Sequence, residues 1–308
     1  MTKPIRMILA ACLGLVAFHA TPAGAGTTAY LSHTGSGTAC TLGSPCSNMA
    51  NAVTAAGTGG EVICLDKGNY GGVTIDFSIT VSCGDGLWEA SAGLLGISTP
   101  AGADVVLEGL VSDSLAAFSG PIMTFNGQGS LHLRRVRLGN VPGIAQGLFF
   151  IPTGAAKLFV TDSYFYNNGT FGLSAGINIK PASGVTASVE IARTRFENDF
   201  FGIIADAATH GGAIRGVVKD SVVSGNTNNG ITAFGAVVLS VINTTIDGNA
   251  NGIVANGAGS AVLVGRSTIT GNNNGVLTFN GGIIYSYGTN ELNGNSPDGA
   301  FTAVIGTH

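Results

Sequence analysis

The chain has 308 residues, of which 49 are glycine and 10% are charged, and its mean hydropathy is +0.39. Soluble proteins average about 25% charged residues, so this low charge content together with 45% hydrophobic residues excludes intrinsic disorder. The net charge of −4 argues against a nucleic-acid partner, and the glycines lack the three-residue period of collagen. The composition instead favours a chain of short repeated strands and turns.

Residues 1–25 have the organisation of a secretory signal peptide. Two basic residues precede an apolar run over residues 7–18, and Ala23-Gly24-Ala25 is typical of a cleavage site. We therefore expect a secreted or periplasmic mature chain, residues 26–308, with 11 basic and 17 acidic residues and a net charge of −6. No later apolar run reaches the roughly 18 residues that a membrane-spanning helix needs.

A lipoprotein signal is the alternative interpretation of the N-terminus. Leu9-Ala10-Ala11-Cys12 is similar to a bacterial lipobox, which would make Cys12 a lipid-modified anchor. However, only five apolar residues precede Cys12 in the run, and the run continues beyond it. We therefore favour cleavage near residue 26.

The four cysteines of the mature chain form an even set, which favours disulfides in an exported protein. Cys40 and Cys46 bracket a Gly-Ser-Pro turn and are expected to close the loop between them. Cys64 and Cys83 lie in separate strand-like runs, so a bond between them would join two successive turns of a coil. Neither pair has zinc-finger spacing or a nearby histidine cluster, and we expect no metal there.

Internal repetition is the strongest signal in the sequence, beginning at about residue 104. A first apolar column consists of Val106, Leu133, Val160, Ile191, Val218, Val241, Val264 and Tyr287. Five residues later each repeat carries a second apolar residue: Val111, Leu138, Phe165, Phe196, Val223, Ile246, Ile269 and Leu292. The repeats are 23 to 31 residues apart, which fits three short strands and three turns. The spacing therefore predicts a parallel β-solenoid with coils about 4.8 Å apart.

Two polar columns accompany the apolar ones. The first alternates in sign over five coils and consists of Glu108, Arg135, Asp162, Arg193, Asp220, Asn243, Arg266 and Thr289. Stacked like charges repel, so this alternation predicts a ladder of ion pairs between coils. The second column predicts a stacked asparagine ladder at tight turns and consists of Asn140, Asn168, Asn198, Asn226, Asn249, Asn272 and Asn295. Near the N-terminus, residues 47–56 predict a short capping helix, begun by Ser47 and ended by Gly57.

The runs Gly59-Gly60-Glu61-Val62 and Gly68-Asn69-Tyr70, followed by the coil repeats, resemble the right-handed parallel β-helix proteins of the pectin-lyase-like superfamily. The resemblance covers about residues 28–305. It implies an all-β, single-stranded, right-handed parallel β-helix of about ten coils over residues 26–308.

Many members of that superfamily are polysaccharide lyases or hydrolases, but their motifs are missing from this sequence. Pectate lyases carry an Arg-x-Pro-x-x-Arg signature, and the nearest run here, Arg193-Thr194-Arg195, lacks the proline. Polygalacturonase-type hydrolases carry Asp-Asp and Gly-His-Gly motifs, whereas His210 lies in Thr-His-Gly-Gly and no Asp-Asp pair occurs. The resemblance therefore implies the fold more strongly than an activity.

A site is expected where insertions lengthen the repeats, around the 31- and 27-residue repeats. A cluster of polar residues lies close together in the sequence there: Lys180, Arg195, Glu197, Asp199, Asp206 and His210. The catalytic candidates there are Arg195, Asp199, Asp206 and His210. In a lyase, Arg195 could act as the base or as a carboxylate clamp, and the two aspartates could hold a cation. The candidate ligand-binding residues are Arg137, Tyr164, Lys180 and Arg195, since three of them share one outward column that a sugar chain could lie on.

Two functions follow from these observations. The first is a non-catalytic secreted β-helix that binds a polysaccharide or associates with the cell envelope, with no cofactor. The second is a lyase or glycoside hydrolase acting on a uronate-type polysaccharide, with calcium in the lyase case. Sparse charge and the missing motifs favour the first, and no sequence feature specifies an oligomeric state.

Overall fold

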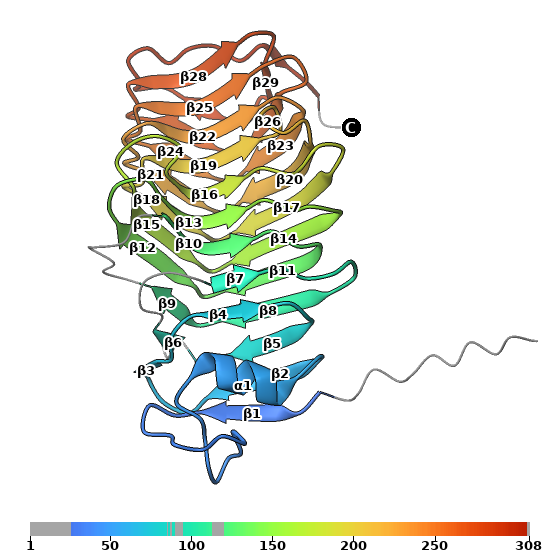
Figure 1. Cartoon of the computed structure of the whole chain (residues 1–308). Coiled ribbons are helices and arrows are strands. Elements are labelled where there is room, and N and C mark those ends of the chain that lie inside the picture. Colours follow the sequence, from blue (N-terminus) through green and yellow to red (C-terminus); the bar gives the residue numbers. More distant parts are fainter. Residues whose placement is uncertain (1–25, 85, 87, 90–94, 113–119, 307–308) are drawn as a thin grey trace, which may run out of the picture.

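A computed structural model describes residues 26–84, 86, 88–89, 95–112 and 120–306. Within these residues, three parallel sheets wind into a β-solenoid of about eight turns (Figure 1). The predicted fold class is confirmed, but the predicted ten coils were too many. The first part of the chain forms a disulfide-closed loop and a helix instead of complete coils. The predicted signal peptide and Cys12 lie outside the described residues.

Each complete coil contributes one strand to each sheet, while the first strand and the last three strands along the chain, at the two ends of the solenoid, belong to incomplete coils. We name the sheets in the order in which the chain meets them. In the described chain, sheet I contains β1 (Thr28–Leu31), β2 (Gly60–Cys64), β5 (Ile79–Ser82), β8 (Asp104–Glu108), β11 (Gly129–Arg134), β14 (Ala156–Thr161), β17 (Thr186–Ala192), β20 (Ala213–Lys219), β23 (Val237–Ile242), β26 (Ala261–Gly265), β29 (Ile283–Ser286) and β31 (Ala303–Val304). Sheet II contains β3 (Gly68–Asn69), β6 (Trp88–Glu89), β9 (Leu110–Ser112), β12 (Arg137–Val141), β15 (Tyr164–Asn168), β18 (Arg195–Glu197), β21 (Val222–Ser224), β24 (Thr245–Asp247), β27 (Thr268–Thr270) and β30 (Glu291–Leu292). Sheet III contains β4 (Val73–Ile75), β7 (Leu95–Ile97), β10 (Gly120–Phe125), β13 (Ala145–Phe150), β16 (Ala175–Ile179), β19 (Phe201–Asp206), β22 (Asn229–Phe234), β25 (Asn251–Asn256) and β28 (Asn274–Phe279).

The apolar columns fill the interior of the solenoid. In sheet I, Leu133 pairs with Val160, and the same column continues without a break to Val264, every member being fully buried. In sheet II the rings of Phe165 and Phe196 stack with their centroids 5.1 Å apart. Because every residue of a column meets its counterpart one coil away, side chains of similar size pack without voids.

The predicted register was wrong by one residue at both ends of the first column. Leu107, not Val106, pairs with Leu133, and Ser286, not Tyr287, pairs with Val264. In sheet II, likewise, the residue opposite Leu138 is Ser112 instead of Val111. Since side chains of a strand alternate between its two faces, the one-residue shift moves the predicted residues away from the interior.

Helix α1 (Met49–Ala56) covers the N-terminal end of the solenoid, beside β1 and β2 (Figure 1). Its N-cap is Asn48, whose side chain accepts a hydrogen bond from the Asn51 amide, so the predicted N-cap Ser47 was wrong by one residue. Gly57, with φ of 66°, ends the helix as predicted. The buried face of the helix protects the edge of the first coil from solvent.

Both predicted disulfides are present. Cys40–Cys46 closes the loop before α1, and Cys64–Cys83 joins the ends of the neighbouring strands β2 and β5, with 4.7 Å between Cα atoms in each pair. Disulfides persist in oxidising compartments, so these bonds are compatible with a periplasmic or extracellular protein.

The sign-alternating column occupies a turn between sheets I and II in which the backbone is left-handed. The φ angles of Arg135, Asp162 and Asp220 lie between 50° and 54°, and that of Arg193 is 48°. The predicted ladder is confirmed in pairs: Arg135 binds Glu108, Arg193 binds Asp162, and Asn243 donates to Asp220. The prediction was wrong by one residue at both ends of this column. The left-handed position is occupied by Gly109 instead of Glu108, and by Gly288 instead of Thr289.

The asparagine ladder is buried between sheets II and III. Each amide Nδ2 donates to the Oδ1 of the next coil, from Asn226 to Asn249, Asn272 and Asn295, at 2.7–2.9 Å. The prediction was wrong at Asn198, which is exposed in a left-handed turn while Asp199 takes the ladder position. Asn140 has the same left-handed backbone as Asn198. The prediction failed here because it selected the asparagine of each repeat instead of the residue at the same position of each coil.

Candidate binding face on sheet II

Arg137, Tyr164 and Arg195 share one outward column of sheet II, as predicted. They lie on β12, β15 and β18, and the backbone register pairs each of them with the next. The residue that follows each one is fully buried in the interior. Since side chains alternate along a strand, the three residues project to the outside, and both arginines are exposed.

A second row of arginines lies beside this column. Arg135 and Arg193 occupy the left-handed turn that precedes β12 and β18, two residues before Arg137 and Arg195. The four arginines line a shallow groove of 390 Å³ together with Asp162, Ser163 and Tyr164. Arg135 and Arg193 were predicted only as members of the ion-pair ladder. The constant separation of two residues between the rows is the signal that could have assigned them to the site.

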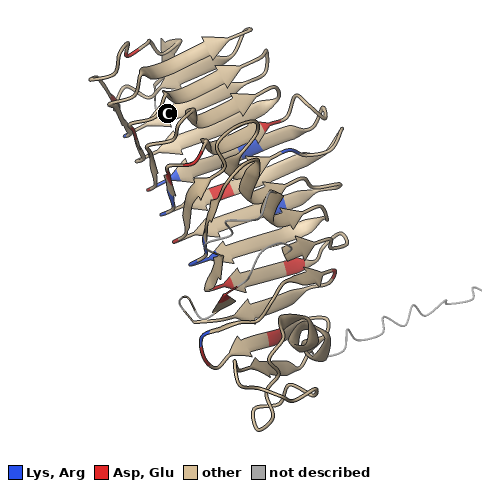
Figure 2. Ribbon diagram, turned by 60° about the vertical axis from the view of Figure 1, so that its left-hand side comes forward, with Lys and Arg blue, Asp and Glu red and all other residues tan. Residues whose placement is uncertain are grey.

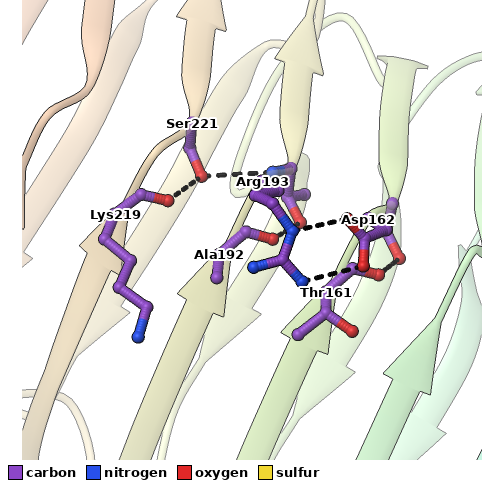
Figure 3. A network of polar contacts seen from close by, with 8 residues as sticks. Thr161, Asp162, Ala192, Arg193, Lys219 and Ser221 are labelled. Carbon is purple, nitrogen blue, oxygen red and sulfur yellow. Dashed lines mark hydrogen bonds and ion pairs between the residues drawn. The ribbon is translucent and has the colours of Figure 1, made fainter.

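Most of these arginines already have a carboxylate partner. Arg193 binds Asp162 through two hydrogen bonds, Nε to Oδ1 at 2.7 Å and Nη2 to Oδ2 at 2.9 Å (Figure 3). The hydrogen bonds from this guanidinium lower the pKa of Asp162 below its ordinary value, so the carboxylate stays charged. Arg135 pairs with Glu108 and Arg195 with Glu197. Within the described residues, Arg137 makes no hydrogen bond or ion pair through its side chain.

Tyr164 is held rigidly at the centre of the groove. Its ring stacks on Tyr166 with 4.5 Å between centroids and 13° between planes. Its hydroxyl donates to Glu197 Oε2 at 2.8 Å. Burial and this bond raise the pKa of Tyr164 to about 12, so the phenol remains neutral and suits a flat contact better than proton transfer.

Asp199 lies away from this face, inside the buried ladder. Its Oδ1 accepts hydrogen bonds from the backbone N–H and the Nδ2 of Asn168 at 2.8 and 2.9 Å, and its own N–H donates to Asn226 Oδ1. Oδ2 is buried and has no hydrogen-bond partner among the described residues. Burial raises the pKa of Asp199 well above its ordinary value. With no exposed surface, the carboxyl group does not face the groove.

Lys180, Asp206 and His210 belong to the other side of the coil. Asp206 ends β19 in sheet III, and its Oδ2 lies 3.7 Å from Nζ of Lys180, the residue after β16. Both are largely buried, whereas His210 is exposed in the loop after β19. The structure therefore brings Lys180 and Asp206 together but separates them from Arg137, Tyr164 and Arg195.

Metal-ligating residues do not gather in the part of the chain that the structure describes. No group of three or more histidine, cysteine, aspartate or glutamate side chains there could hold a metal ion. Among the same residues, no helix is long and apolar enough to span a bilayer. The chain matches no protein-family model, no curated protein and no solved structure.

Proposed function

We propose that this protein is exported and binds an acidic polysaccharide along sheet II without cleaving it. One observation carries the proposal: Arg137, Tyr164 and Arg195 follow each other on three neighbouring strands, with Arg135 and Arg193 alongside. Guanidinium groups bind carboxylates through paired hydrogen bonds, and a tyrosine ring offers an apolar face to a sugar ring.

The spacing of the groups suits a polymer. Residues of one column repeat once per coil, so Arg137 and Arg195 are about 10 Å apart along the solenoid axis. The same separation applies to Arg135 and Arg193 in the second row. A chain with regularly placed carboxylates could therefore contact several arginines at once, while the ring of Tyr164 lies between them.

The existing ion pairs do not prevent such binding. The Arg193–Asp162 pair has 56% and 47% of its side chains exposed, and such exposed pairs contribute only about 0–1 kcal/mol to stability, so a ligand carboxylate can replace Asp162 at little cost. Arg195 has 60% of its side chain exposed, and Arg137 is exposed and unpaired within the described chain. Arg137 is therefore the residue expected to contribute most to ligand affinity.

The test compares the wild type with Arg137→Ala in titration calorimetry against a soluble polyuronate and a neutral glycan. We expect polyuronate binding that weakens with added salt, and about a tenfold loss in Arg137→Ala, equivalent to about 1.4 kcal/mol. Arg215→Ala is the matched control, because Arg215 is an exposed arginine on sheet I. Equal losses in both variants, or tighter binding of the neutral glycan, would contradict the proposal.

The same mixtures are followed for unsaturated products and for new reducing ends. The lyase or hydrolase alternative predicts turnover that Arg195→Ala abolishes. Binding without turnover supports the proposed function.

A further inference from the structure

The groove on sheet II carries its charges in layers, one layer for each of three neighbouring coils. The first and third layers, from the coils of β12 and β18, contain two arginines each, and the middle layer, from the coil of β15, contains none. The lining residues are, layer by layer, Arg135 and Arg137; Asp162, Ser163 and Tyr164; and Arg193 and Arg195. Charge is sparse over most of the ribbon, so a layered arrangement of this kind is a local feature (Figure 2).

Asp162 places a negative charge in the middle layer. Two hydrogen bonds, at 2.7 and 2.9 Å, hold its carboxylate beside Arg193, and 47% of its side chain is exposed. Among the described residues that line the groove it is the single acidic one. The acidic partners of the neighbouring arginines, Glu108 and Glu197, are only 20% and 19% exposed and do not line the groove. A ligand anion at the middle layer would therefore meet a like charge.

The described side chains of the middle layer also have no hydrogen-bond donor left for an anion. Ser163 is buried, and its hydroxyl donates to the carbonyl oxygen of Thr161 at 2.8 Å. The Tyr164 hydroxyl donates to Glu197 Oε2, also at 2.8 Å. A ligand carboxylate in this layer would lose hydrogen bonds to water without replacing them. The partly exposed ring of Tyr164 instead offers an apolar contact, which suits a neutral sugar.

We infer that the ligand of this groove is a polysaccharide in which uronate units alternate with neutral sugars, and that Asp162 selects for it. The inference rests on the proposed function. A sugar unit in an extended chain advances about as far as one coil, so uronates on every second unit would reach both basic layers, about 10 Å apart. The neutral unit between them would lie on Tyr164. In a chain with a carboxylate on every unit, one carboxylate would fall beside Asp162.

This selection opposes the total charge of the ligand. A surface that attracted anions by its net charge alone would bind the more highly charged chain more tightly. In the groove, the additional carboxylate would find a like charge and no free donor, so the less charged chain should bind more tightly. The two explanations therefore predict opposite orders of affinity.

The test is titration calorimetry of the mature chain, residues 26–308, with two oligosaccharides of equal length, each long enough to cover the three layers. One carries a carboxylate on every sugar, and the other carries a carboxylate on every second sugar. We expect the wild type to bind the alternating oligosaccharide about fivefold more tightly. Asp162→Asn removes the charge and supplies an amide donor, so this variant should bind the two oligosaccharides about equally.

Asp220→Asn is the matched control. Asp220 is exposed in the next left-handed turn after Arg193, accepts a hydrogen bond from Asn243 at 2.6 Å, and lies outside the groove. With the same change in net charge, this variant should keep the wild-type preference. Equal binding of both oligosaccharides by the wild type, tighter binding of the fully charged one, or a preference that persists in Asp162→Asn would overturn the inference and leave the proposed function standing. Loss of the preference in Asp220→Asn would do the same. Binding of neither oligosaccharide would overturn the proposed function and this inference with it.

Discussion

Replacing Asp199 by asparagine should stabilise the protein at neutral pH. In the ladder, Asn226, Asn249 and Asn272 each use Oδ1 as acceptor and Nδ2 as donor to the next coil. Asp199 Oδ1 accepts from Asn168 in the same way, so its Oδ2 stands where the other residues have Nδ2. Only a protonated carboxyl group can donate from that position.

The magnitude follows from the missing donor. A buried polar atom without a partner costs about 1–3 kcal/mol, and Asp199→Asn should recover that amount at pH 7. For a chain of this size, this corresponds to a rise of about 2–6 °C in the melting temperature.

The sign of the pH dependence is fixed by the direction of the shift. Burial raises the folded-state pKa of Asp199, so the folded wild type binds a proton that the unfolded chain releases above about pH 3.9. Below that pH, Asp199 makes its full contribution to the free energy of unfolding of the wild type. It falls by about 1.4 kcal/mol per pH unit as the pH rises toward the folded-state pKa. The advantage of Asp199→Asn should therefore be largest at neutral pH and disappear near pH 4.

The assay is thermal unfolding of both proteins by calorimetry between pH 4 and pH 8. Asp162→Asn is the control, because that carboxylate is exposed and has a lowered pKa. Asp162→Asn should lower the free energy of unfolding slightly, whereas Asp199→Asn should raise it. If Asp199→Asn were less stable than the wild type at neutral pH, or if its advantage did not depend on pH, the reasoning about the protonated carboxyl would be refuted.

Three further outcomes are expected. Arg193→Glu places like charges beside Asp162 and Asp220 and should lower the melting temperature, reflecting a loss of about 1 kcal/mol, while an unchanged melting curve would argue against the ion-pair ladder. Phe196→Ala opens a void in the fully buried stack with Phe165 and should cost about 3–5 kcal/mol in urea unfolding, where a loss below 1 kcal/mol would contradict the packing. Removing the Cys64–Cys83 disulfide, whose cysteines are 19 residues apart, should lower the free energy of unfolding by about 3 kcal/mol in the same assay. Removing Cys40–Cys46, whose cysteines are only 6 residues apart, should cost less.

The interior of the fold could be predicted because each coil needs apolar residues at the same inward positions. Leu133, Val160 and Ile191 meet one another at a fixed position of the coil, although they are 27 and 31 residues apart, so the recurring pattern in the sequence becomes contact in space. Prediction failed where the repeat gains or loses one residue, as at Val106 and Tyr287. It also failed where residue type and position disagree, as at Asn198, because the buried ladder accepts a carboxyl group in place of an amide.

The candidate site was predictable in part. Arg137, Tyr164 and Arg195 share a column that depends on the repeat alone, so the sequence was sufficient to group them. Lys180 was grouped with them by closeness in sequence. A coil turns through all three sheets within 23 to 31 residues, and closeness in sequence therefore says little about which face a residue occupies.

The equal length of the C-terminal coils makes the size of the molecule adjustable. Asn226, Asn249 and Asn272 are each 23 residues apart, and the sheet III strands beside them pair at separations of 22 and 23 residues. Removing residues 237–259 would bring Asn226 opposite Asn272 and restore every column with one coil fewer. A gene encoding such coils can lengthen or shorten by unequal crossing-over without leaving the fold. The length of the protein along the solenoid axis can thus change while its cross-section stays constant.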